Sequence, residues 1–520
     1  MPDAASQRET IAFLSQPDSY GLKNEAVERV ETHGAIVFLA GERAYKLKRA
    51  VKYPYMDYST PEKRKAMCER ELQINRRIAP QIYLEVRSIL PGADGHLRFG
   101  PDEAAAARDH VVVMRRFDQE TLFGRLCDAG KLTPELTRQT AEMVAAFHAK
   151  AEVTRDFGGA DGIAAAVREN NTVLASMIGA PFAADQVADF TRASDAALRR
   201  VSALLDQRRE KGLVRRCHGD LHLNNIFLFD GKPMLFDALE FEDNFACIDV
   251  LYDLAFLLMD LERHHARAHA NTLFNRYLEI SADYDGLAAL PLFFACRAAI
   301  RAHVSVSRAA ASGNPQTAFH DEARAYFDLA REFLRSAPAR LIVVGGLSGT
   351  GKTTLARLIA PAIGRAPGAV ILRSDVTRKR LLGVSESTRL PESAYTPEMS
   401  VKVFGAMART AAAILAAGHA VVMDAVYGTQ SERDEISDVA ASAGARFDGL
   451  WLEADPAVLA RRIAARRGDA SDATVAVLQK QLAAIPAPED WIRIDAGRTP
   501  EAIAKDVMKR LHPLPPRGHT

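Results

Sequence analysis

The sequence predicts a two-domain protein in which an α+β domain precedes an α/β domain built on a doubly wound parallel sheet. The chain has 520 residues, more than a single hydrophobic core normally serves. Its first part begins with strand-like segments and continues with long helical ones. Its last part alternates apolar strands with helical stretches, the pattern of parallel βαβ units. We expect the first domain over residues 1–340 and the second over residues 341–512.

The composition is that of a globular protein without a dominant charge. Hydrophobic residues make up 48% and charged residues 26%, and the net charge is +1, so no global field directs the chain to nucleic acid or a membrane. The N-terminus lacks signal-peptide features, and no run of about 18 apolar residues suited to a bilayer is recognised. The five cysteines are scattered without CxxC spacing, which argues against disulfides and zinc. We predict a cytoplasmic location.

The first domain begins with short strands and becomes helical. Residues 35–49 are typical of two strands around a turn at Gly41, residues 61–78 of a helix, and residues 109–117 of a buried strand that leads into a polar connection. Helices dominate from Leu132 onward. Strands return briefly over residues 217–241.

The second domain shows five apolar strands separated by helical stretches. A proline-rich tail, residues 513–520, is predicted to be disordered. The strands are expected at residues 341–346, 369–375, 419–425, 447–453 and 491–495.

A phosphate-binding motif follows the first strand of the second domain. Residues 346–353 match GxxxxGK[ST] in the strand-to-helix context that this motif requires. Glycines let backbone amides surround phosphates, the helix adds its positive end, and Lys352 supplies a mobile cation. Thr353 offers a hydroxyl to magnesium. The predicted nucleotide-binding residues are Gly346, Ser348, Gly349, Thr350, Gly351, Lys352, Thr353 and Thr354.

The second domain resembles small P-loop kinases of the gluconate kinase and polynucleotide kinase type. The resemblance implies that Asp375 and Arg378 bind the acceptor hydroxyl, with Asp375 taking its proton. It also implies that Asp424 holds magnesium through water. A helix-capping role is the alternative for both carboxylates. Arg462 and Arg466, one helical turn apart, could stabilise the transferring phosphoryl group.

A second constellation lies in the first domain, where residues 217–241 contain an HGDxxxxN block. Asp220 is suited to accept the proton of an acceptor hydroxyl. Asn225 and Asp237, held by short apolar strands, are suited to supply oxygen ligands to magnesium. His218 is expected to orient the loop rather than to react.

These residues resemble the aminoglycoside phosphotransferase and choline kinase superfamily, which is related to protein kinases. The resemblance implies a bilobal domain with an N-lobe over about residues 20–114 and a helical C-lobe over about residues 118–335.

The same resemblance assigns residues of the N-lobe. It makes Lys46 the strand lysine that binds the α and β phosphates and Glu71 its helix partner, with Lys48 and Glu69 as rivals. It places a hinge that contacts adenine at residues 114–117, beginning with Met114.

Two departures from this family affect the expected ligands. The loop of residues 31–35, which precedes Lys46 where the family has a glycine-rich loop, has a single glycine, Gly34, and this leaves the choice between ATP and GTP open. Arginines outnumber carboxylates over residues 261–340, which argues against a polycationic aminoglycoside as acceptor. The histidines of residues 264–269 are read as exposed helical residues rather than metal ligands.

Each half therefore carries a phosphate cation, a candidate base and magnesium ligands. The sequence predicts a bifunctional kinase that uses ATP and Mg²⁺ to phosphorylate hydroxyl groups of small molecules. In one alternative, one half is an ATP-binding regulatory module. In another, the second half phosphorylates a nucleic-acid 5′-hydroxyl, but no basic groove with interleaved aromatic residues supports this. The sequence carries no signal for an oligomeric state.

Overall fold

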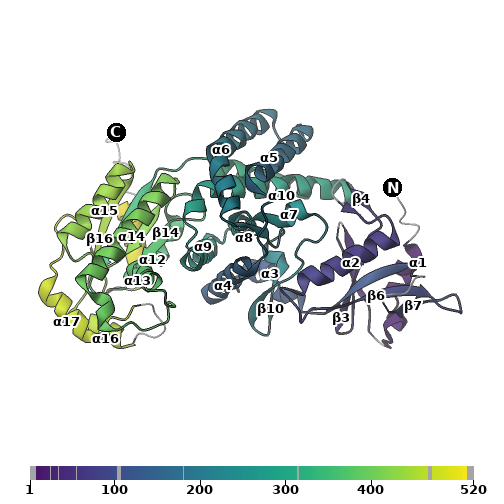
Figure 1. The fold of residues 1–520 in the computed structure, drawn as a ribbon, viewed down its shortest axis with the longest axis horizontal. Coiled ribbons are helices and arrows are strands. Elements are labelled where there is room, and N and C mark those ends of the chain that lie inside the picture. Colours follow the sequence, from purple (N-terminus) through teal and green to yellow (C-terminus); the bar gives the residue numbers. More distant parts are fainter. Residues whose placement is uncertain are drawn as a thin grey trace. The chain divides into compact units, whose positions relative to one another are not determined.

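The computed structural model describes residues 7–23, 25–32, 34–53, 56–101, 107–179, 181–312, 316–465 and 471–511. The chain forms two compact units, and Figure 1 follows it from the purple N-terminal part to the yellow C-terminal part. The first unit contains residues 1–264 and 292–331, and the second contains residues 265–291 and 332–520. The predicted tail, residues 513–520, lies outside the described residues.

The first unit opens with a six-stranded antiparallel sheet in the order β1-β2-β3-β8-β6-β7. Successive side chains of a strand point to opposite faces. In β3, Ala44 therefore joins the cluster beside helix α2, while Tyr45 and Leu47 join the cluster on the other face. Lys46 lies on the α2 side by the same alternation. The elements are β1 (Glu28–Glu31), β2 (Ala35–Ala40), β3 (Arg43–Lys48), α2 (Pro61–Asn75), β6 (Tyr83–Pro91), β7 (Leu97–Gly100) and β8 (Asp109–Arg115).

The rest of the first unit is mainly helical. Helix α8 is buried along most of its length, as expected for a helix that is apolar on most sides. Two short antiparallel pairs of strands, β9 with β12 and β10 with β11, interrupt the helices. The main elements are α3 (Phe123–Asp128), α4 (Pro134–Lys150), α5 (Gly159–Ser176), α6 (Ala184–Glu210), β9 (Val214–Arg216), β10 (Ile226–Phe229), β11 (Lys232–Leu235), β12 (Cys247–Asp249), α8 (Val250–Arg263), α10 (Leu290–Ser312) and α11 (Gln316–Phe333).

The second unit is built on a five-stranded parallel sheet in the order β14-β15-β13-β16-β17. Its central strand β13 is buried throughout, as is usual where helices cover both faces of a parallel sheet. The predicted fold classes of both halves are confirmed. The strands are β13 (Arg340–Gly346), β14 (Val370–Arg373), β15 (Val421–Asp424), β16 (Arg446–Glu453) and β17 (Ile492–Asp495). The helices are α12 (Lys352–Ile359), α13 (Ser374–Leu381), α14 (Pro397–Ala416), α15 (Gln430–Ser442), α16 (Pro456–Ala465), α17 (Val475–Ala484) and α18 (Pro500–Leu511).

The second unit also includes a segment that precedes the expected boundary near Arg340. Helix α9 (Arg267–Ser281) and the short helix η4 (Asp285–Ala289) belong to it. The cause is a set of buried hydrogen bonds to β14, the edge strand. Asn275 Oδ1 accepts from the Ile371 amide at 2.6 Å, and the amide groups of Asn271 and Asn275 donate to the Ala369 carbonyl at 3.0 and 3.1 Å. Helix α9 thus satisfies backbone groups that an uncovered edge would leave unpaired.

Two helices among the described residues are long and apolar enough to cross a membrane, over residues 285–307 and 397–416, whereas the sequence was expected to hold no such run. Buried residues make up 67% and 33% of these windows. The first contains Arg297, whose buried guanidinium lies over the Tyr252 ring. Core helices of soluble proteins meet the same criteria, so the two helices are weak support for a membrane span.

Candidate active sites

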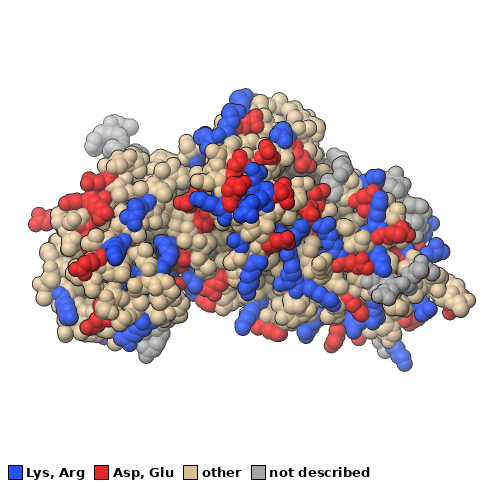
Figure 2. Space-filling view, in the orientation of Figure 1, with Lys and Arg blue, Asp and Glu red and all other residues tan. Residues whose placement is uncertain are grey.

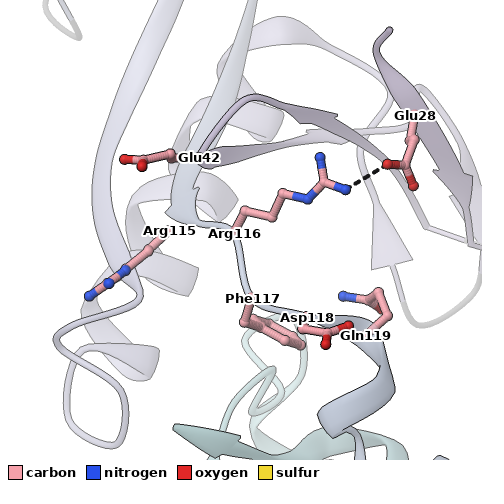
Figure 3. Close-up of a pocket in the computed structure, with 7 residues that line it drawn as sticks. All are labelled: Glu28, Glu42, Arg115, Arg116, Phe117, Asp118 and Gln119. Carbon is pink, nitrogen blue, oxygen red and sulfur yellow. Dashed lines mark hydrogen bonds and ion pairs between the residues drawn. The ribbon is translucent and has the colours of Figure 1, made fainter. Parts of the chain in front are cut away.

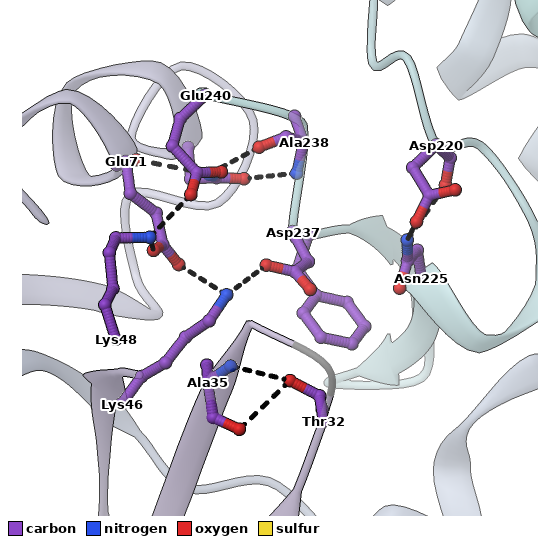
Figure 4. A network of polar contacts seen from close by, with 12 residues as sticks. Thr32, Ala35, Lys46, Lys48, Glu71, Asp220, Asn225, Asp237, Ala238 and Glu240 are labelled. Carbon is purple, nitrogen blue, oxygen red and sulfur yellow. Dashed lines mark hydrogen bonds and ion pairs between the residues drawn. The ribbon is translucent and has the colours of Figure 1, made fainter. Parts of the chain in front are cut away.

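The first site centres on Lys46, whose ammonium joins the two lobes of the first unit (Figure 4). It lies 2.8 Å from Oε1 of Glu71 and 2.6 Å from Oδ1 of Asp237. Burial opposes its charge, but the carboxylates of Asp237 and Glu71 raise the pKa of Lys46 well above its usual value. Burial likewise opposes the charge of Glu71, yet Lys46 and Lys48 lower its pKa to about 2. Lys46 and Glu71 therefore both stay charged near neutral pH.

Lys48 shares Glu71 but faces a different acidic residue. Its ammonium lies 2.6 Å from Glu71 Oε2 and 2.5 Å from Glu240 Oε1, and its side chain is only 2% exposed. Glu69 is 49% exposed and pairs with Lys65 instead. The structure thus places Lys46 and Glu71, rather than their rivals, beside Asp237.

Asp253 of α8 holds the HGD loop through hydrogen bonds to its backbone. The Asp253 carboxylate accepts hydrogen bonds from the backbone amides of His218 and Gly219 at 3.1 and 2.9 Å. The His148 ring lies 3.1 Å from the same carboxylate. The His218 ring contacts the Phe236 carbonyl at 2.9 Å. His148, Cys217 and Asp253 are close enough to hold a metal, but Asp253 is already engaged by the loop. His218 therefore lies in a position that orients the loop.

Asp220 is surrounded by donors that fix one of its oxygens. Asn225 Nδ2 donates to Asp220 Oδ2 at 3.1 Å and to its carbonyl at 2.8 Å, and His222 Nε2 lies 3.3 Å from Oδ2. His222 Nδ1 accepts a hydrogen bond from the Asn224 amide. The ring proton is therefore assigned to Nε2, which makes Nε2 a donor to Asp220. Burial opposes the charge of Asp220, but His222 and His218 lower its pKa below the usual range.

The connection after β8 borders a pocket of about 500 Å³ (Figure 3). An ion pair of 2.6 Å joins Arg116 to Glu28 of β1. Met114 is paired with Ala44 and Tyr83 in the sheet and is 9% exposed, so its side chain belongs to the core rather than to this pocket. The pocket is lined by Glu28, Glu42, Arg115, Arg116, Phe117, Asp118 and Gln119.

The P-loop of the second unit needs its glycines for two different reasons. Gly346 and Gly349 have φ of 135° and 87°, which other residues rarely adopt. A Cβ at these positions would lie 2.6 Å from the Leu452 carbonyl and 2.8 Å from the Leu459 carbonyl. Gly351, with φ of 91°, precedes α12.

Three polar contacts involve residues of this loop. The Ser348 amide donates to Oε1 of Gln481, a residue of α17, at 2.9 Å, and Lys352 Nζ donates to the Leu347 carbonyl at 3.1 Å. The Thr350 hydroxyl also donates to Leu347, at 2.8 Å. Thr354 lies exposed on α12. One backbone amide of the P-loop is therefore engaged by a side chain.

Thr353 and Asp424 meet at the carboxyl ends of β13 and β15, which are neighbours in the sheet. The Thr353 hydroxyl donates to Asp424 Oδ2 at 2.6 Å, and Arg373 Nε lies 3.5 Å from the same oxygen. These contacts occupy Asp424 with Thr353 and Arg373.

Asp375 lies in the first turn of α13, close to Asp424. Burial, followed by the charge of Asp424, raises its pKa above the usual value. Helix α13 has no side-chain cap, so the geometry gives Asp375 no capping role. Arg378 donates to the Ala394 carbonyl at 2.9 Å and lies 4.8 Å from the centre of the Tyr395 ring. Its Nε has no partner among the described residues.

Arg462 lies half-buried on α16, whose Leu459 and Ile463 pack against Gly349 of the P-loop. Arg466 falls outside the described residues. Of the two predicted arginines, the structure therefore describes only Arg462.

Comparison with known proteins assigns both halves. Residues 35–290 match the Phosphotransferase enzyme family, and residues 341–488 match an AAA domain. The uncharacterized proteins Rv2004c of Mycobacterium tuberculosis and Mb2027c of Mycobacterium bovis are each 33% identical over 476 residues, which cover 89% of this chain and 90% of each relative. The chain belongs to the family of these mycobacterial proteins. Its two domains make it an ATP-dependent kinase.

Solved structures also match parts of the kinase. A sugar kinase from a Janibacter species is 24% identical and covers 34% of this chain and 95% of its own, with a TM-score of 0.27. A choline/ethanolamine kinase family protein from Mesorhizobium loti is 14% identical and covers 63% of this chain and 95% of its own, with a TM-score of 0.38.

Both sites of the kinase offer the oxygen ligands that magnesium prefers. Asp237 and Asn225 carry them in the first, and Thr353 and Asp424 in the second. Asp237 has φ of 62°, a left-handed conformation that costs energy in a residue with a side chain and is found at functional sites. These residues fit a magnesium ion that accompanies ATP.

Sequence reasoning missed four polar residues of these sites. Glu240 and His222 stand beside recognised motif residues, three positions after Asp237 and two after Asp220, so a wider reading of that block would have included them. Arg373 and Gln481 carry no such signal, because only the fold brings them to Asp424 and Ser348.

Proposed function

We propose that the kinase is bifunctional, with each domain transferring the γ-phosphate of ATP to a hydroxyl group of a small molecule. One observation supports this most directly. Each unit brings together a lysine suited to phosphates, oxygen groups suited to magnesium and a carboxylate suited to an acceptor hydroxyl. The acceptor class, a sugar, an amino alcohol or a related metabolite, follows from the resemblance of the motifs.

In the first domain, Lys46 binds the α and β phosphates while Glu71 holds its ammonium in place. Asp237 and Asn225 would hold magnesium, which supplies charge neutralisation for the phosphates. Asp220 takes the proton of the acceptor hydroxyl as that oxygen bonds to the γ-phosphorus. The bond from phosphorus to the β,γ-bridging oxygen breaks, and ADP leaves. The pocket beyond β8 is suited to the nucleotide base.

In the second domain, the P-loop amides and Lys352 hold the phosphates, and Thr353 with Asp424 would hold magnesium. Asp375 takes the acceptor proton, and its raised pKa suits a group that must bind a proton. In this proposal Arg378 binds the acceptor and Arg462 stabilises the transferred phosphoryl group.

A regulatory role for the second domain is the competing function, because Gln481 engages the Ser348 amide at 2.9 Å. A domain that bound ATP there without releasing ADP would fit such a role.

We also propose a cytoplasmic location and a function that does not involve nucleic acid or membranes. On the face that Figure 2 shows, acidic and basic residues are interspersed among the described residues. Such mixing of both signs of charge is unlike the basic stripe of a nucleic-acid-binding surface.

The test is ADP release with ATP and magnesium across sugars, amino alcohols, nucleosides and 5′-hydroxyl oligonucleotides. The intact kinase is compared with Asp220→Asn and Asp375→Asn. The proposal expects acceptor-dependent release that each variant removes for one acceptor class only. Release from oligonucleotides lost in Asp375→Asn would instead assign the second domain to nucleic-acid ends.

A further inference from the structure

Helix α9 is part of the second unit, although the chain on both sides of residues 265–291 belongs to the first. Asn275 bonds the amide of Ile371 and the carbonyl of Ala369. A side-chain amide here replaces the neighbouring strand that β14 lacks on its outer edge. Because β14 runs directly into Asp375, α9 supports the strand that carries the proposed base.

An ionic chain leads from α9 to the magnesium ligands. Arg276 of α9 pairs with Glu386, and Glu386 Oε1 lies 3.2 Å from Nη1 of Arg373. Arg373 Nε is 3.5 Å from Asp424 Oδ2. That same oxygen accepts the Thr353 hydroxyl at 2.6 Å.

The inner half of this ionic chain is shielded from water, whereas the outer half is partly exposed. The side chains of Arg373 and Asp424 are 3% and 6% exposed, against 22% and 29% for Arg276 and Glu386. A partly exposed ion pair contributes little to stability by itself. Its effect on a buried charge can be larger, because buried ionic contacts depend strongly on geometry.

We propose that Arg276 is a positioning residue of the P-loop site. It holds Glu386, which holds Arg373 against Asp424, and so keeps Asp424 oriented for magnesium. The second kinase therefore depends on a helix encoded within the sequence of the first. This inference rests on one part of the proposed function, namely that the second site binds ATP together with magnesium.

The test measures how much Mg²⁺ the second site needs to bind a fluorescent ATP analogue. The full chain is used in a Lys46→Ala background, which removes the phosphate cation of the first site. Arg276→Met, Glu386→Gln and their combination are compared with Arg510→Met, which removes an exposed arginine paired with Asp506 in the same unit. Thermal unfolding without nucleotide is recorded for each variant.

Each single variant is expected to raise the half-saturating Mg²⁺ concentration about 3- to 10-fold, because residues of one ion-pair network are energetically coupled. Binding without Mg²⁺ and the Arg510→Met control should stay unchanged. The double variant should be no worse than either single one.

An unchanged Mg²⁺ requirement in folded Arg276→Met would overturn the inference. Additive effects in the double variant would also overturn it, because they would show that Arg276 and Glu386 act separately. If Arg276→Met fails to fold, Glu386→Gln decides by the same measurement. Nucleotide binding by the unsubstituted second site tests the proposed function itself, so the two ideas can fail independently.

Discussion

The ammonium of Lys46 lies 2.6 Å from the carboxylate of Asp237, which joins the sheet of the first unit to its HGD block. Lys48, two residues along the same strand, instead faces Glu240 at 2.5 Å. Both lysines share Glu71. The two lysines lie on the same face of β3 but have different surroundings. Lys46 lies near the proposed phosphate site, and Lys48 is buried in the core.

Substitutions of the two lysines should separate activity from stability. Lys46→Ala is expected to lower kcat/KM of the first reaction at least about 100-fold, since it removes the cation proposed to bind the α and β phosphates of ATP, and to leave the second reaction unchanged. Lys48→Met should cost about 3–5 kcal/mol of unfolding free energy, because it leaves Glu240 buried without its cation. Steady-state kinetics and urea unfolding measure the two effects. Equal losses of activity with unchanged stability would contradict this division.

The two reactions should differ in their pH dependence. A base must be deprotonated to act, so activity falls as pH drops through its pKa. The pKa of Asp220 is lowered by its histidine neighbours, and that of Asp375 is raised by burial and Asp424. The acid limb of kcat/KM should therefore lie at higher pH for the second reaction than for the first. Profiles at saturating ATP and magnesium test this order, and a reversed order would refute the assignment of the bases.

Gln481 should compete with phosphate at the P-loop. Its side chain accepts the Ser348 amide at 2.9 Å, a contact that phosphate binding must replace. We expect Gln481→Ala to tighten ATP binding at the second site about 2- to 10-fold, the range of one net hydrogen bond. Calorimetric titration in the Lys46→Ala background measures the affinity. Weaker binding by Gln481→Ala would mean that Gln481 helps to hold the nucleotide.

Lys352→Ala should abolish nucleotide use in the second domain alone. The P-loop lysine binds the phosphates with a positive charge that backbone amides cannot supply. ATP binding at the first site serves as the internal control. Loss of both binding events would indicate a single composite site.

Local motifs made much of the kinase predictable. The P-loop and the HGD block combine a short spacing with a strand context, so sequence placed Lys352, Thr353, Asp220 and Asp237 in two sites. Contacts between distant segments were not predictable. Asn275 reads as an ordinary helical residue, and only the fold shows that it bonds Ile371 of an edge strand 96 positions away. The expected boundary near Arg340 differs from the structural units for this reason.

Met114 illustrates a second limit. The resemblance fixes where the hinge falls in the chain, but the direction of a side chain there depends on the register of β8 with its neighbours. Pairing with Ala44 and Tyr83 buries Met114 in the core, and the pocket begins at Arg115.

The most direct test of the central claim is ADP release by the intact kinase and by Asp220→Asn and Asp375→Asn, measured with ATP, magnesium and the acceptor panel. Two independent sites predict that each substitution removes release for its own acceptor and leaves the other intact. Loss of all release in either single variant, or no acceptor-dependent release by a kinase that still binds ATP at both sites, would contradict it.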